Sequence, residues 1–152
     1  RYRFLDDAFV LARGITYPIA LEGALKILET NRIKVKGYSI SDFYHGPLAQ
    51  ISSGTLAIVL AAQGSLYGDA VDMINRIESL ESTGVDVVVI TDNAELAAKS
   101  KFAVKLPAVA GGDSVSPFLY AVTLQLFALK LTDVKGIDPD VSKALKKVTI
   151  TK

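Results

Sequence analysis

The side chains with the clearest potential for chemistry are Glu22, Lys26 and Glu29, which recur at i, i+4 and i+7. This spacing places them on one stripe of a helix. The residues between them are mostly apolar, so we expect the helix to be largely buried. Two interpretations remain open. The stripe faces solvent with ordinary i,i+4 pairing, or it lines a closed cleft where burial and the adjacent ammonium set carboxylate pKa values for proton transfer.

The single histidine of the chain, His45, is the second candidate for chemistry. Its unperturbed pKa near 6.5 suits proton transfer, and the following Gly46-Pro47 predicts a defined bend in the loop. A single histidine in a loop nevertheless lacks a catalytic role more often than it has one. One histidine and no cysteine offer too few ligands for a typical metal site, so we expect no metal. The sequence also has no Walker or dinucleotide glycine pattern, and we expect no cofactor.

Two glycine-containing segments resemble phosphate loops. The segment 52–55 (SSGT) precedes an apolar run, whereas phosphate loops follow a strand and open a helix, so we interpret it as a turn. Gln63, Gly64 and Ser65 stand in the correct order, after an apolar run and before a helical pattern. They carry few hydroxyl groups, which makes them a weak candidate for substrate phosphate.

Apolar runs that alternate with helical patterns must position these residues. Near-continuous Val/Ile/Leu runs indicate strands buried on both faces, and such strands between helices predict a parallel sheet. We therefore expect an α/β, doubly wound, flavodoxin-like parallel sheet with helices on both faces, and Thr16 as the cap of its first helix. The expected strands are 9–12, 33–37 at an edge, 55–61, 85–91 and 102–106. The expected helices are 16–29, 67–82, 94–100 after a cap at 92–93, and 117–131, with a loop at 38–47.

In such sheets, ligands gather outside the carboxyl ends of the strands. This rule points to Arg13 and Gly14 after the first strand, to residues 62–64 after the third, and to residues 91–92 after the fourth. Arg13, Gly14, Gln63, Gly64 and Ser65 are therefore the candidate substrate-binding residues.

The composition excludes several classes of protein. The chain has 152 residues, half of them hydrophobic, which fits one globular domain rather than a disordered segment. Seventeen Lys and Arg against sixteen Asp and Glu give a net charge of +1, so we expect neither nucleic-acid nor membrane-surface binding. No run of about 18 apolar residues is present. The absence of cysteine fits a cytoplasmic protein. A chain that begins at Arg1 and has Met73 as its only methionine is expected to be a piece of a longer protein.

Three ordered motifs span essentially the whole chain: RGITYPIALEGALKILE, DFYHGPLAQ and DPDVSKALKKVTITK. Together they resemble the second sugar isomerase (SIS) domain of the glucosamine-6-phosphate synthase family, and two-domain glucosamine-6-phosphate deaminases share these features. The resemblance implies a SIS domain over residues 1–134 and a tail, 135–152, that reaches the active site. It also implies an aldose–ketose rearrangement of a hexose 6-phosphate through an enediol or enolamine, and it favours the cleft interpretation of the charged stripe.

The resemblance assigns a role to each residue that matches a motif. Glu29 is similar to the carboxylate that moves a proton between C1 and C2. Lys26 is similar to the lysine that steadies the enediolate oxygen, and Glu22 to the acid that positions it. His45 resembles the residue that opens the sugar ring, often in the partner subunit's site. Lys147 resembles the tail lysine that reaches the open-chain carbonyl, as a Schiff base in synthases.

The resemblance also implies partners. The Ser/Thr-rich phosphate loop of the family belongs to a first SIS domain, so we expect that domain, and in a synthase a glutaminase domain, to complete the protein. A homodimer and a sugar phosphate, fructose 6-phosphate or glucosamine 6-phosphate, are the other expected partners. A glutaminase would favour amination, whereas SIS domains alone would favour deamination. Two non-enzymatic functions remain as alternatives: a phosphosugar-sensing module and a dimerisation scaffold.

Overall fold

The computed structural model describes residues 1–80, 84–109 and 115–141. Its centre is a five-stranded parallel sheet in the order β2-β1-β3-β4-β5. The strands are β1 (Asp7–Ala12), β2 (Lys34–Ser39), β3 (Leu56–Ala61), β4 (Asp86–Thr91) and β5 (Phe102–Lys105). This order and direction confirm the predicted doubly wound, flavodoxin-like sheet, with β2 at an edge.

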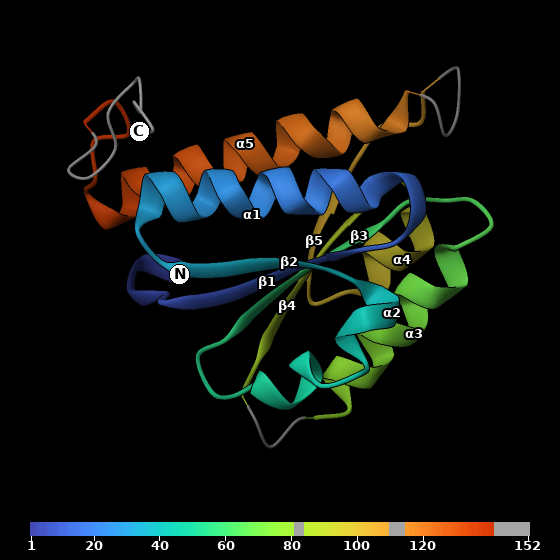
Figure 1. Cartoon of the computed structure of the whole chain (residues 1–152). Helices are drawn as coiled ribbons and strands as arrows, with labels where there is room; N and C mark the ends of the chain where they lie inside the picture. Colours follow the sequence, from blue (N-terminus) through green and yellow to red (C-terminus); the bar gives the residue numbers. More distant parts are fainter. Residues whose placement is uncertain (81–83, 110–114, 142–152) are drawn as a thin grey trace, which may run out of the picture.

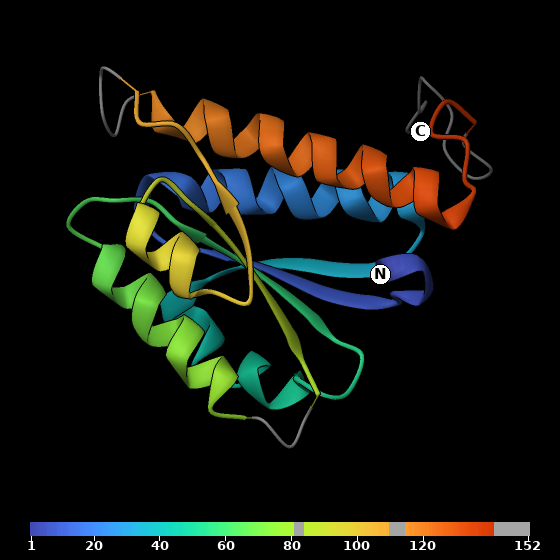
Figure 2. The ribbon, with the colours of Figure 1, turned by 180° about the vertical axis from the view of Figure 1, so that it is seen from behind.

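Helices cover both faces of the sheet. They are α1 (Tyr17–Asn31), α2 (Ile40–Phe43), α3 (Tyr67–Glu78), α4 (Ala94–Lys99) and α5 (Ser116–Lys135). Short 3-10 helices lie at η1 (Tyr2–Phe4), η2 (Gly14–Thr16) and η3 (Pro47–Gln50). α1 and α5 lie side by side on one face, and α2, α3 and α4 lie on the other (Figure 1), as the view from behind also shows (Figure 2).

The central strands are buried on both sides, which explains their continuous apolar sequence. Every residue of β3 is buried. Ile58 packs into the core beneath α1 and α5, whereas its neighbours Ala57 and Val59 pack into the core beneath α3. Because side chains alternate across a strand, one apolar run supplies both cores.

α1 and α5 approach closely at Gly23. A Cβ built on Gly23 would lie 2.3 Å from Cδ1 and 3.0 Å from Cβ of Leu124 on α5. At the last residue of α1, the buried Asn31 donates from Nδ2 to the carbonyl oxygen of Ala128, at 3.1 Å. The small residue and this hydrogen bond fix the position of α1, and with it the charged stripe, relative to α5.

Three local predictions were wrong. The expected loop 38–47 contains α2, because Ile40 and Phe43 turn inward and are fully buried. Thr16 occupies the position before α1 but does not cap it, since its hydroxyl donates to the carbonyl oxygen of Arg13 at 3.0 Å. The last helix runs beyond residue 131 to Lys135 and ends where Gly136 takes a left-handed conformation, φ +67°.

The expectation that α1 is largely buried was also wrong. Its buried residues lie on the side towards the sheet and α5, and include Ala20, Gly23 and Ile27. Three leucines on the other side are 43–45% exposed: Leu21, Leu25 and Leu28. The described residues of this chain therefore leave part of the apolar surface of α1 exposed to solvent.

Candidate functional site

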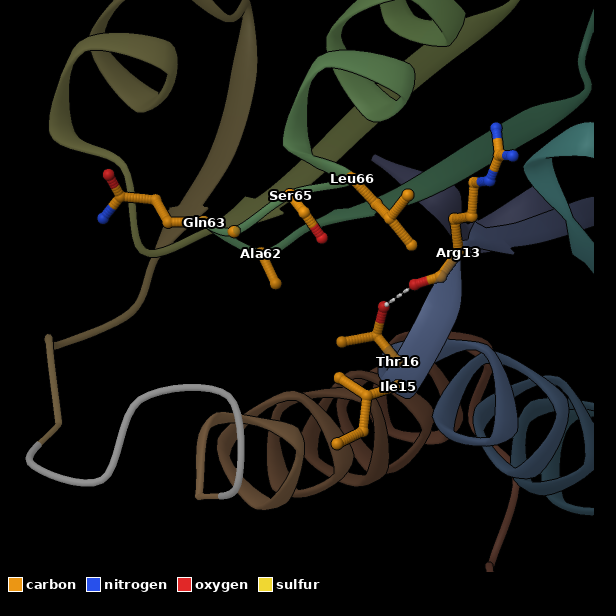
Figure 3. A pocket seen from close by; sticks show the side chains of 8 residues that line it. Arg13, Ile15, Thr16, Ala62, Gln63, Ser65 and Leu66 are labelled. Atoms are coloured by element: carbon orange, nitrogen blue, oxygen red, sulfur yellow. Dashed lines mark hydrogen bonds between the residues drawn. The ribbon is translucent and has the colours of Figure 1, made fainter.

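A pocket lies at the point where the strand order changes direction, between the carboxyl ends of β1 and β3 (Figure 3). Its volume is about 240 Å³. Residues from both strand ends line it: Arg13, Ile15, Thr16, Ala62, Gln63, Gly64, Ser65 and Leu66. Two of the three segments to which the sequence rule for open α/β sheets points, those after β1 and β3, line this pocket, whereas residues 91–92 do not. Gly14 allows the segment after β1 to come close to Leu66. Its φ is +64°, a conformation that favours glycine, and a Cβ at this position would lie 2.6 Å from Cδ1 of Leu66.

The side chains around this pocket offer little to a phosphate. Nη1 of Arg13 lies 2.7 Å from Oδ2 of Asp69, so the guanidinium is already paired. Figure 3 shows it directed away from Ala62 and Ser65, while the apolar Leu66 and the Ser65 hydroxyl point into the space. An anion here would have to compete with Asp69 for the arginine. The pocket thus lies at the strand ends where a ligand crevice is expected, but its lining residues offer few groups that could bind an anion.

A hydrogen-bond network anchors the loops beside the pocket. Oδ1 of Asp92 accepts from the backbone N of Gln63 at 2.9 Å and from the Tyr120 hydroxyl at 3.4 Å. Nδ2 of Asn93 donates to Oε1 of Gln63 at 3.3 Å. Burial, reinforced by the charge of Asp92, raises the pKa of Tyr120, so its hydroxyl stays a neutral donor. The sequence analysis missed Tyr120, because nothing in its spacing connects α5 to the end of β4.

The three predicted residues of α1 are brought together. Nζ of Lys26 lies 2.8 Å from Oε2 of Glu29 and 3.8 Å from Oε1 of Glu22. The side chains of Glu22, Lys26 and Glu29 are 46%, 36% and 32% exposed. The hydrogen bond with Glu29 raises the pKa of Lys26, against its partial desolvation, and the charges of both glutamates add to the effect. Lys26 is therefore a stable ammonium between two carboxylates. We call these three residues the charged row.

The charged row runs along α1 away from the pocket. Glu22 follows the first residue of α1 by five positions and Glu29 follows it by twelve, which are about 8 and 18 Å of helix at 1.5 Å per residue. None of the five main pockets formed by the described residues is lined by Glu22, Lys26 or Glu29. Within this part of the chain, the row lies at the surface, with its side chains 32–46% exposed.

His45 lies on the other face of the sheet. It is exposed in the turn between α2 and η3, where its backbone N donates to the carbonyl oxygen of Asp42 at 3.1 Å. Gly46 follows with φ +141°, a conformation that favours glycine. α2 packs into the core shared with α3, whereas α1 packs into the opposite core. The structure therefore does not bring His45 to the charged row of the same chain.

Lys147 lies outside the described residues. The described part of the tail approaches the C-terminal end of α1, because Nη2 of Arg32, just after α1, donates to the carbonyl oxygen of Val141 at 3.3 Å. Lys147 follows Val141 by six positions, a reach of at most about 20 Å. Lys26 and Glu29 lie within about 9 Å of Arg32 along the helix axis. The role that the resemblance gives to Lys147 is compatible with these lengths.

The described residues form neither a metal-ligand cluster nor a membrane-spanning helix. No group of three or more His, Cys, Asp or Glu side chains within residues 1–80, 84–109 and 115–141 is arranged to hold a metal ion. None of the helices in those same ranges has the length and apolar composition needed to cross a membrane.

Comparison with known proteins decides the family. The sequence profile of the SIS domain family matches residues 6–134, most of the chain. The chain belongs to the SIS domain family. The charged row, the pocket between the ends of β1 and β3 (from here on the switch-point pocket) and the exposed His45 are therefore features of a SIS domain.

The relatives of this SIS domain are aminotransferases by name. It is 37% identical, over 95% of its length, to the glutamine–fructose-6-phosphate aminotransferase (isomerizing) of Thermococcus kodakarensis, and spans 23% of that protein. A protein of the same name from Sphingobium yanoikuyae is 34% identical, with 95% of this chain and 92% of that sequence covered. The solved C-terminal domain of glucosamine–fructose-6-phosphate aminotransferase from Francisella tularensis superposes with a TM-score of 0.77 at 26% identity, over 90% of this chain and 38% of that one.

Proposed function

We propose that this SIS domain is the C-terminal, isomerase-type domain of an enzyme that acts on a hexose or hexosamine 6-phosphate. The reaction is an aldose–ketose isomerisation of fructose 6-phosphate or glucosamine 6-phosphate, coupled to amination or deamination. The observation that carries the proposal is the charged row, in which Lys26 joins Glu22 and Glu29 on one surface of α1. The names of the relatives support the substrate class.

The geometry of the row suits proton transfer next to a carbonyl. Glu29 removes a proton from C1 of the open-chain ketose form and returns it to C2, which converts ketose to aldose through an enediol or enolamine. The ammonium of Lys26 stabilises the negative charge that develops on the substrate oxygen. Lysine is protonated at neutral pH at its ordinary pKa, and the hydrogen bond with Glu29 raises that pKa further. Glu22 lies on the other side of the ammonium, 3.8 Å away. Lys147 reaches the open-chain carbonyl from the tail.

Other parts of the longer protein complete this site. Arg13, which lines the switch-point pocket, is paired with Asp69, so the described lining residues offer no free cation for the 6-phosphate. The phosphate therefore binds mainly to the first SIS domain. Whether ammonia is added or released depends on the partner domains, a glutaminase favouring addition. The protein acts as a dimer, and His45, on the face away from α1, opens the sugar ring in the partner subunit's site.

The test is the Glu29→Gln substitution in the full-length protein. The amide keeps the shape of the side chain but cannot accept the proton, so we expect kcat to fall at least about 100-fold, the usual contribution of a general base. Binding of fructose 6-phosphate, measured by calorimetry, should change less than about twofold. Glu95→Gln, an exposed carboxylate on α4, is the matched control and should leave both unchanged. Unchanged turnover in Glu29→Gln removes Glu29 from the role of base.

Two observations favour a second candidate, a non-catalytic phosphosugar-binding or dimerisation module. The charged row lines none of the five main pockets formed by the described residues, and the arginine beside the switch-point pocket is paired. A regulator of this kind needs no proton transfer, however. The clustering of Glu22, Lys26 and Glu29 on α1 would then have no catalytic explanation. A full-length wild-type protein that binds fructose 6-phosphate without converting it supports this alternative over the enzyme.

A further inference from the structure

The switch-point pocket has the order of elements from which phosphate sites are built. Gln63, Gly64 and Ser65 leave the carboxyl end of β3 and lead into α3. Gly64 has φ +147°, a conformation that favours glycine, and Arg13, at the end of β1, lines the same pocket. A loop after a strand, a helix that begins beside it and an arginine are typical parts of an anion site. In this domain, two carboxylates already engage those parts.

Asp69 engages the arginine. Its Oδ2 lies 2.7 Å from Nη1 of Arg13, and Figure 3 shows the Arg13 side chain directed away from Ala62 and Ser65. Asp69 also lies in the first turn of α3, where the helix dipole favours a negative charge. One carboxylate therefore holds the guanidinium away from the pocket and offsets the positive end of the helix.

Asp92 engages the loop. Its Oδ1 accepts hydrogen bonds from the backbone N of Gln63 at 2.9 Å and from the Tyr120 hydroxyl at 3.4 Å. The N–H that Gln63 could offer to an anion is therefore used within the chain. A phosphate that entered the pocket would find no free cation among the described lining residues, and it would be repelled by the charges of Asp69 and Asp92.

The pair of Arg13 and Asp69 has a small role in folding. The two side chains are 39% and 37% exposed. Ion pairs with such exposure stabilise a protein little, because water screens the charges and both side chains lose rotamer freedom. The main effect of the pair is therefore on the charge that is available to the pocket, and a substitution of Asp69 should leave the fold intact.

The position of the pocket gives a reason to exclude phosphate from it. The pocket includes Ile15 and Thr16, which directly precede α1. Glu29 lies about 18 Å further along that helix. A hexose 6-phosphate is shorter than this distance, even in its open-chain form. A substrate held by its phosphate in the pocket would therefore keep C1 and C2 away from Glu29.

We infer that Asp69 is a specificity-determining residue, which holds Arg13 out of the switch-point pocket and so prevents a sugar phosphate from binding there. Asp92 supports this exclusion through its bond to the N–H of Gln63. The 6-phosphate is then left to the first SIS domain. The inference rests on the proposed function for the identity of the excluded ligand, but phosphate binding is measurable without turnover.

The test is a titration of the 152-residue chain with inorganic phosphate at constant ionic strength, followed by NMR of the backbone amides of Gln63, Gly64 and Ser65. We expect Asp69→Asn to bind phosphate at least about tenfold more tightly than the wild type, because the substitution releases the Arg13 guanidinium and removes a like charge. Circular dichroism should show the same fold in both proteins. Equal affinities in the variant and the wild type overturn the inference.

Glu78→Gln is the matched control. Glu78 is the exposed last residue of α3 and follows Asp69 by nine positions, about 14 Å along the helix. The substitution removes the same charge at a distance beyond the screening length, so phosphate affinity should change less than about twofold. A gain equal to that of Asp69→Asn would show a general effect of net charge and would overturn the inference.

The double variant Asp69→Asn, Arg13→Gln tests the source of the gain. We expect it to lose the affinity gained in Asp69→Asn, because the cation that turns to the phosphate is then absent. A gain that survives Arg13→Gln overturns the role given to the arginine. The outcome is independent of the Glu29→Gln test: unchanged turnover in Glu29→Gln would refute the catalytic proposal and leave this titration unaffected, whereas a failed titration would leave the role of Glu29 in place.

Discussion

Gly23 is the residue at which a single methyl group should disturb the position of the charged row. It lies in the middle of α1, where α1 contacts α5, and the Gly23→Ala substitution would place its Cβ 2.3 Å from Cδ1 of Leu124 and 3.0 Å from Cβ of the same residue. The Cδ1 atom can rotate away. The Cβ atom cannot, because it is fixed to the backbone of α5, so the two helices must separate.

The expected cost follows from two opposing effects. Alanine is a better helix former than glycine by about 1 kcal/mol. Overpacking of a close-packed core costs about 1–3 kcal/mol, and the fixed Cβ of Leu124 places Gly23→Ala at the upper end. We therefore expect a net loss of about 1–2 kcal/mol in the free energy of unfolding. For a chain of this length, the loss corresponds to a fall of about 3–6 °C in Tm.

Gly68 provides the matched control. It lies in the first turn of α3, and a Cβ built there would have no neighbour within 4 Å. We expect Gly68→Ala to gain about 0.5–1 kcal/mol, because only the helix-forming effect remains. Urea unfolding of the two variants at pH 7 makes the comparison. If Gly23→Ala is stabilised as much as Gly68→Ala, the close approach of α1 and α5 at Leu124 is refuted.

Two further predictions follow from the site. Burial raises the folded-state pKa of Tyr120, so the stability that its neutral hydroxyl contributes is present below pH 10 and is lost as pH rises towards the folded pKa, by up to about 1.4 kcal/mol per pH unit. Urea unfolding between pH 9 and 11 should therefore show a shallower alkaline loss in Tyr120→Phe than in the wild type, and equal slopes would contradict this. In the full-length protein, His45→Ala should slow the use of cyclic substrate more than that of an open-chain analogue; equal losses would argue against ring opening by His45.

The sequence predicted the architecture because the strands carry a strong signal. The runs at 55–61 and 85–91 have no polar residue in their centres, a pattern typical of parallel strands covered on both faces, and helical patterns stand between them. Short elements were harder to predict from the sequence. Ile40 and Phe43 show a helical spacing only once, in the four residues of α2, and one repeat is too little to separate a helix turn from a loop.

The site was predicted in its parts but not in its arrangement. The i, i+4, i+7 spacing correctly brought Glu22, Lys26 and Glu29 together, since helix geometry is local. Spacing says nothing about which side of a helix the rest of the chain covers, so the exposure of Leu25 was not foreseen. The pairing of Arg13 with Asp69 was missed for the same reason, because a contact between β1 and α3 depends on the tertiary fold.

The central claim is that Glu29 moves a substrate hydrogen between C1 and C2. The most direct measurement is hydrogen exchange in D₂O: the full-length protein is incubated with fructose 6-phosphate, and deuterium at C1 and C2 is followed by NMR. We predict that the wild type incorporates deuterium, that Glu95→Gln does so at the same rate, and that Glu29→Gln does so at least about 100 times more slowly. Exchange in Glu29→Gln at the wild-type rate would contradict the assignment, since another group would then carry the proton.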